Sequence, residues 1–216
     1  LQPEEIQMGF LKLLKGSPMR EEAKKWNMVY SPYAPYEILR TSDISYDEIM
    51  VLKKIEHMVD KYYNSGKFIN IIEYFICKFD QPFDFYHHLA MFFHSKGYFN
   101  RNISSVDYYK IFLEFQETYF NKVSMELKEI VKYDYLKFNK KKWLPDFLLR
   151  ERNKKEENCI KEMIKSSPIK VSKKYHMEKF FINIEKLLNS SVLERKEGYV
   201  VFDIERNKEI YLFDNI

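Results

Sequence analysis

Helix-start signals recur along residues 45–165, and they constrain the fold more than any other feature of the sequence. Ser45 and Glu48 form a capping-box pattern, in which the two side chains satisfy backbone N–H groups at the start of a helix. The apolar residues that follow share one helical stripe: Ile49, Leu52, Ile55, Val59 and Tyr62. Gly66 can then end the helix in the left-handed conformation.

Similar signals predict further helices with short connections, over 67–79, 82–96, 104–120, 124–138 and 145–164. The last fifty residues change their pattern. Residues 168–174 are typical of a strand, 176–188 of an amphipathic helix, and 199–204 with 209–213 of a hairpin. We therefore expect a mainly α protein, a helical bundle with a small C-terminal antiparallel sheet packed on one helix.

The opening of the chain has a different character. Residues 6–14 (IQMGFLKLL) are mostly apolar, which predicts a strand buried on both faces of a parallel sheet. Ser17 and Pro18 then favour the start of a short helix to about residue 26. Two prolines within residues 28–41 push the backbone toward extended geometry, so we expect an ordered extended loop there.

Composition excludes several classes of protein. Five glycines and seven prolines leave little material for a turn-rich β-sandwich or a phosphate-binding glycine loop, and no GxGxxG, GxxxxGK[ST], HExxH or GxSxG motif occurs. No apolar run approaches the roughly 18 residues of a membrane span. Cys77 and Cys159 are too far apart for a local CxxC pair. They indicate reduced thiols of a cytoplasmic protein, with Cys77 in the core.

Three histidines fall in the predicted helix over 82–96. His87 and His94 are two turns apart on one face, and with Asp84 they would offer ligands for a transition metal. The same spacing is also explained without a metal, by histidines that lie on the partly exposed face of a helix in an aromatic-rich bundle. The pattern is too unspecific to assign a metal site, and no residue is assigned a catalytic role.

Positive charge is concentrated in residues 137–165, which carry ten basic and five acidic residues while the whole chain has a net charge of +4. Lys140, Lys141 and Lys142 precede Trp143, so lysines able to contact phosphates adjoin a ring able to stack on a base. Abundant Lys, Asn, Ile, Phe and Tyr with three Ala indicate an AT-rich genome, and the lysines therefore also fit a solvated helix face. This segment defines the alternative function of a nucleic-acid or protein docking module.

A second candidate is the irregular segment 30–37. Tyr30, Tyr33, Tyr36 and Glu37 are typical of an aromatic wall with one carboxylate, which can line a pocket. A proline-braced loop packed on the bundle explains the same residues.

Four strings in a fixed order carry a resemblance to a known group of proteins. They are residues 6–18 (IQMGFLKLLKGSP), 35–39 (PYEIL), 62–68 (YYNSGKF) and 83–85 (FDF). Together they resemble the C-terminal region, of unknown function, of radical S-adenosylmethionine proteins that have a cobalamin-binding domain. The similarity is high from residue 1 to about residue 138 and lower in the residues that follow.

The resemblance implies a parent enzyme, an oxidoreductase or transferase of unknown substrate. Its cofactors would be cobalamin, S-adenosylmethionine and a 4Fe-4S cluster held by a CxxxCxxC loop in a partial α/β barrel. Neither that loop nor a cobalamin motif occurs in these residues. We therefore expect no cofactor and no catalysis in this chain alone.

In the parent, the resemblance implies three parts: 1–16 as a remnant of the last barrel strand, 17–165 as a helical accessory domain, and 166–216 as a small α+β subdomain. Ligands bind at the carboxyl ends of parallel strands. This rule, applied to the implied strand, places Lys12, Leu14 and Lys15 near substrate or cofactor. Tyr36 and Glu37, from the aromatic segment 30–37, are expected near the same ligands.

The expected partners are the protein's own N-terminal cobalamin-binding and radical S-adenosylmethionine barrel domains, with no membrane. Leu1 in place of Met fits a piece of a longer protein. The strand over 6–14 would then lack its neighbours, so we expect it to be disordered, folded back on the bundle, or paired with a second copy in a dimer. The first hypothesis is an accessory domain that closes one side of the barrel and shapes substrate access.

Overall fold

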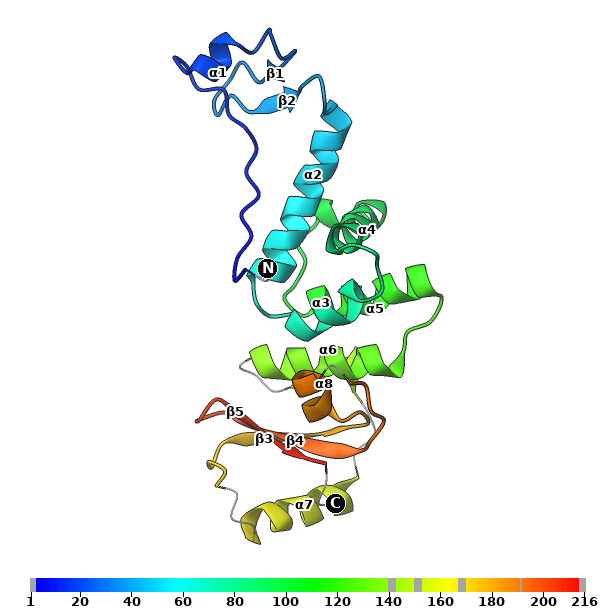
Figure 1. Cartoon of the computed structure of the whole chain (residues 1–216). Coiled ribbons are helices and arrows are strands. Elements are labelled where there is room, and N and C mark those ends of the chain that lie inside the picture. The colour runs from blue at the N-terminus through cyan, green and yellow to red at the C-terminus, as the bar shows by residue number, and fades with distance from the viewer. Residues whose placement is uncertain (1–2, 140–142, 150–152, 167–169, 191, 214–216) are drawn as a thin grey trace. The chain divides into compact units, whose positions relative to one another are not determined.

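The computed structural model describes residues 3–139, 143–149, 153–166, 170–190 and 192–213. It confirms the predicted fold class, mainly helical with a three-stranded antiparallel sheet near the C-terminus and no barrel closure (Figure 1). The chain forms two compact units. The first unit comprises residues 1–66 and 75–102, and the second unit comprises residues 67–74 and 103–216.

The helix α2 of the first unit begins at the predicted capping box. α2 (Tyr46–Met58) starts with the Glu48 N–H donating to Ser45 Oγ at 3.3 Å and the Ser45 N–H donating to the Glu48 carboxylate at 2.7 Å. It continues as the π-helix η1 (Val59–Asn64). Gly66 follows with a φ of 65°, so the predicted end of this helix is confirmed.

Aromatic rings pack on α4 (Pro82–Ser95) from the segments before it in the chain. The Tyr62 and Phe93 rings meet edge to face with centroids 5.9 Å apart, and the Phe75 and Phe85 rings stack at 5.6 Å. All four side chains are almost completely buried. α4 ends before Gly97, as predicted, and η2 (Tyr98–Asn100) follows.

The first forty residues form short elements: α1 (Pro18–Glu21), β1 (Val29–Tyr30) and β2 (Ile38–Arg40). The helix predicted to residue 26 is therefore shorter. Residues 6–14 are not the doubly buried strand that the sequence predicts. Among them only Leu13 is buried, while Leu11 is 40% and Leu14 is 55% exposed. A strand is buried on both faces only when other layers cover it, and here few residues do so.

Three helices begin the second unit: α3 (Ile69–Ile76), whose last two residues belong to the first unit, α5 (Asp107–Phe120) and α6 (Met125–Phe138). The predicted cap is present at α6, where Ser124 Oγ accepts from the Leu127 N–H at 3.0 Å. α6 has buried residues on all its faces, Glu129, Lys132 and Asp134 among them. Buried charges require partners, so α6 is held by polar as well as apolar contacts.

The sheet has the order β3 (Tyr175–Phe180), β4 (Gly198–Asp203), β5 (Lys208–Leu212), with both pairs antiparallel. The predicted hairpin is therefore confirmed as β4 and β5. All residues of β4 are buried, because successive side chains point to opposite faces of the sheet and a helix packs on each face. Tyr199 and Val201 pack against α7 (Lys154–Ser166), whereas the Phe202 ring lies 6.0 Å from the Tyr133 ring of α6.

Three sequence predictions for the second unit are wrong. Residues 176–188 are not one helix but β3 followed by α8 (Ile184–Ser190). The predicted strand over 168–174 lies partly outside the described residues, and its described residues 170–174 form no strand. The helix predicted over 145–164 is η3 (Asp146–Leu148) and then α7, because Leu149 has an extended ψ of 147°.

Two single positions, Cys77 and Gly198, have surroundings that the sequence does not predict. Cys77 was predicted in the core and is exposed, since it lies just past the end of α3. Gly198 opens β4 against the ring of Phe213, and a Cβ atom at Gly198 would lie 2.2 Å from Phe213 Cδ1. A side chain at this position would therefore displace the end of β5.

Candidate functional site

Two segments singled out in the sequence lie side by side in the first unit. The Leu13 N–H donates to the Tyr36 carbonyl at 2.9 Å, and the Ile38 N–H donates to the Leu11 carbonyl at 2.8 Å. Lys12 and Glu37 form an antiparallel bridge between these bonds. The structure therefore brings the Lys12–Lys15 stretch together with Tyr36 and Glu37.

Arg20 joins these segments through its side chain. Its guanidinium lies 4.9 Å from the centroids of both the Tyr30 and the Tyr36 rings. Nη1 also donates to the Leu13 carbonyl at 3.1 Å. Cation–π contacts and a charge-assisted hydrogen bond thus tie α1 to the loop that carries Tyr36.

The backbone of Tyr36 has an unusual conformation. Its φ of 59° lies in the left-handed region, which large side chains seldom adopt. The Tyr36 N–H donates to the Tyr33 carbonyl at 2.8 Å, and this turn holds the residue in place. Such conformations occur where the surroundings fix them, often at functional sites.

The charges around Tyr36 are mainly positive. Glu37 forms an ion pair with Lys53 of α2, while the Lys15 ammonium lies 5.7 Å from the centroid of the Tyr36 ring. Lys12 and Lys15 are exposed, and neither forms an ion pair with another described residue. An exposed ammonium group beside an aromatic ring, with a second exposed lysine three residues away, can bind a carboxylate or a phosphate.

The segment before this cluster is extended and held at both ends (Figure 1). Asn64 accepts from the Ile6 N–H at 2.9 Å and donates to the Ile6 carbonyl at 3.0 Å. The backbone groups of residues 7–10 form no hydrogen bond to other described residues. On one side these residues border an apolar groove of about 390 Å³, lined also by Ile38, Ile44 and Leu52.

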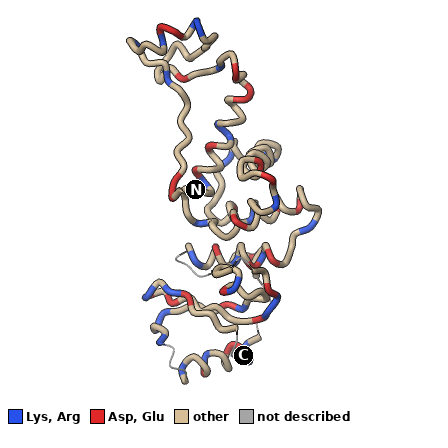
Figure 2. The backbone as a smooth tube through the Cα atoms, in the orientation of Figure 1, with Lys and Arg blue, Asp and Glu red and all other residues tan. Residues whose placement is uncertain are grey.

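The other candidates lie elsewhere. Lys140, Lys141 and Lys142 are outside the described residues, and Trp143, in the second unit, is 82% exposed. Basic and acidic residues are interspersed along the described chain (Figure 2).

Two histidines of α4 contact neighbouring residues. The His87 ring stacks on Phe83, and His88 Nδ1 lies 2.7 Å from the Asp84 carbonyl. No group of three or more His, Cys, Asp or Glu in the described part of the chain is placed to hold a metal ion.

Sequence reasoning missed three residues that build the site: Arg20, Lys53 and Asn64. Each acts on a residue at least seven positions away, outside the reach of helix or hairpin spacing. Asn64 belongs to the YYNSGKF string of the resemblance, but no local pattern indicates that its amide holds Ile6.

Replacing Arg20 by alanine is expected to loosen this cluster. The variant loses two cation–π contacts and the bond to Leu13, worth together about 1–2 kcal/mol at a partly exposed position. Hydrogen exchange at the Leu13 and Ile38 amides should become about tenfold faster. Lys24→Ala, an exposed change just beyond α1, serves as the control; equal exchange in the two variants would contradict the assigned role of Arg20.

The comparisons with known proteins give one match. A family model described as a protein of unknown function (DUF4080) matches residues 24–202. No curated protein and no solved structure matches the chain. No helix within the described ranges is long and apolar enough to cross a membrane.

Proposed function

The chain belongs to the DUF4080 family of proteins of unknown function, and we propose that it is the C-terminal accessory domain of a radical S-adenosylmethionine enzyme with a cobalamin-binding domain. In this proposal the chain closes one side of the barrel and shapes access to the substrate. The ordered strings at 6–18, 35–39, 62–68 and 83–85, which resemble such enzymes, motivate it.

The observation that carries the proposal is the open backbone of residues 7–10. An extended segment whose N–H and C=O groups lack partners can add to the edge of another sheet. Asn64 and the bonds at Leu11 and Leu13 already hold the segment straight, so little conformational entropy is lost on pairing. We therefore assign residues 6–14 as the last strand of the barrel.

The assignment gives the cationic cluster a place in the enzyme. Lys12, Leu14 and Lys15 lie at the carboxyl end of the strand, where ligands of parallel sheets bind. Tyr36 and Glu37 adjoin them through the bonds described above. In this arrangement the two lysines bind an anionic group of the substrate, and Tyr36 covers it.

The residues of this chain do not fit the iron–sulfur cluster of such an enzyme. Its only cysteines, Cys77 and Cys159, are both exposed and belong to different units. A 4Fe-4S cluster needs several cysteine thiolates close together. The chain therefore contributes strand pairing and substrate contacts, and no step through the cluster, S-adenosylmethionine or cobalamin is assigned to its residues.

Hydrogen exchange tests the strand assignment directly. In the isolated chain the Met8 and Phe10 amides should exchange quickly, because they have no acceptor. In the complete protein they should be protected at least about a hundredfold, while the Leu13 amide, already bonded to Tyr36, serves as the internal control. Equal exchange at Met8 and Phe10 in the two proteins would overturn the assignment.

A further inference from the structure

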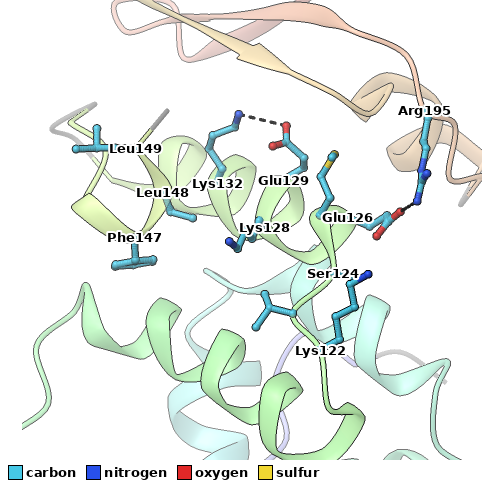
Figure 3. Close-up of a pocket in the computed structure, with 12 residues that line it drawn as sticks. Lys122, Ser124, Glu126, Lys128, Glu129, Lys132, Phe147, Leu148, Leu149 and Arg195 are labelled. Atoms are coloured by element: carbon cyan, nitrogen blue, oxygen red, sulfur yellow. Dashed lines mark hydrogen bonds and ion pairs between the residues drawn. The ribbon is translucent and has the colours of Figure 1, made fainter. Parts of the chain in front are cut away.

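A cavity of the second unit lies beside the first turns of α6, far in sequence from the open strand. Its volume is about 600 Å³. Figure 3 shows Phe147, Leu148 and Leu149 on one side and Arg195, joined to Glu126, on the other, with Lys128 between them. The cavity thus has an apolar wall and a charged wall.

Both acidic residues of the lining already have a cation. Glu126 accepts from Arg195 Nη2 at 2.8 Å, and this hydrogen bond lowers the pKa of the Glu126 carboxyl. Glu129 Oε2 lies 3.2 Å from Lys132 Nζ, and both of these side chains are buried. The negative charges of the lining are therefore neutralised within the protein.

Two lysines of the lining are different. Lys122 and Lys128 are exposed, and neither is ion-paired to any carboxylate that the structure describes. One precedes the Ser124 cap and the other follows it on α6. The cavity therefore presents two ammonium groups whose charge is not neutralised.

The apolar wall is incompletely covered. Leu149 is 56% and Met125 is 48% exposed, and both border the cavity together with the half-buried Phe147. Single exposed apolar residues are common, but here they surround the same space as two lysines. A ligand with an apolar body would remove this surface from water.

We infer that this cavity binds a small organic anion, a molecule with one anionic group on an apolar body. The anionic group lies between Lys122 and Lys128, and the apolar body lies against Phe147, Leu149 and Met125. This site belongs to the second unit and goes beyond the proposed function, so either can fail without the other.

The test uses 8-anilinonaphthalene-1-sulfonate as the probe, which carries a sulfonate on two aromatic ring systems. Binding is read at the cavity itself by labelling the nine methionine methyl groups with carbon-13 and identifying Met125 with a Met125→Leu variant. We expect the Met125 resonance to shift saturably with one equivalent of probe. A titration that moves other methionines and leaves Met125 unchanged would overturn the inference.

Variants separate the charge from the apolar contact. Lys122→Ala with Lys128→Ala should weaken the sulfonate at least about tenfold and leave the uncharged analogue N-phenyl-1-naphthylamine unchanged. Phe147→Ser should weaken both probes. Lys173→Ala with Lys174→Ala, two exposed lysines of the same unit outside the lining, is the matched control. Equal sulfonate affinity in the two double-lysine variants would also overturn the inference.

Discussion

Replacing Lys132 by methionine is expected to lower the free energy of unfolding of the second unit by about 3–5 kcal/mol. The side chains of Lys132 and Glu129 are 2% and 0% exposed, and their charged atoms lie 3.2 Å apart. Lys132 Nζ also donates to the Lys179 carbonyl and lies 4.2 Å from the centroid of the Phe180 ring. The variant keeps the apolar stem but leaves the Glu129 carboxylate buried without the Lys132 ammonium group.

A second substitution shows whether the lost cation causes the effect. Lys132→Met with Glu129→Gln removes the buried charge and keeps an acceptor for the Phe181 N–H, so about 2 kcal/mol or more should be recovered. Lys128→Met, at an exposed position in the first turns of α6, should change stability by less than about 0.5 kcal/mol. Urea unfolding followed by circular dichroism measures all three variants. If the double variant were no more stable than Lys132→Met, the loss of stability would not be caused by the unpaired Glu129 charge, and the assigned role of the ion pair would be wrong.

Asp134 should make the second unit less stable as the pH rises toward neutrality. Its carboxyl group accepts hydrogen bonds from the backbone N–H groups of Asn70 and Ile71, both at 3.1 Å, and from the side-chain amide of Asn70. Burial nevertheless raises the pKa of Asp134 from the ordinary 3.8 to about 7. Between these two values the folded chain holds a proton that the unfolded chain has released. Raising the pH therefore favours unfolding. The stability that the protonated Asp134 contributes, about 4 kcal/mol in full, is present below about pH 4 and is lost by about pH 7.

The matched variant is Asp134→Asn, which has nearly the same shape and does not titrate. Its amide oxygen can accept from both backbone N–H groups, and the Asn70 amide can turn its own oxygen toward the new NH₂ group. Unfolding in urea at pH 5, 6, 7 and 8 should give a wild-type stability that falls with pH more steeply than that of the variant. The difference between the two slopes removes the contribution of other groups, such as His57, whose pKa burial lowers. Parallel pH profiles would contradict the raised pKa.

Local signals predicted the helices because the interacting groups are three or four residues apart. The Ser45 capping box, the Ser124 cap and the glycines at 66 and 97 all act within a single turn of the chain. The hairpin of β4 and β5 was also predicted, because its two strands follow each other directly in the chain and pair across a short turn from Asp203 to Lys208. β3 was mistaken for a helix because it pairs with β4, whose partner residues lie 18 to 28 positions later, and spacing within 175–180 does not report this pairing.

The candidate site was only partly accessible from the sequence. Its segments at 12–15 and 36–37 were selected by the resemblance, and the structure brings them together through the Leu13 and Ile38 hydrogen bonds. Arg20, which lies between two tyrosine rings, has no local pattern that marks it. The cavity of the second unit was missed because Lys122 and Arg195 are brought to it by folding and are distant in sequence.

The central claim is that this chain belongs to a radical S-adenosylmethionine enzyme, and cleavage of S-adenosylmethionine tests it most directly. The complete protein that contains the chain should be purified, reconstituted with iron and sulfide without oxygen, and reduced. The account predicts a CxxxCxxC loop in that protein and formation of 5′-deoxyadenosine, with none from residues 1–216 alone. A complete protein that lacks the cysteine loop and forms no 5′-deoxyadenosine after this treatment would contradict it.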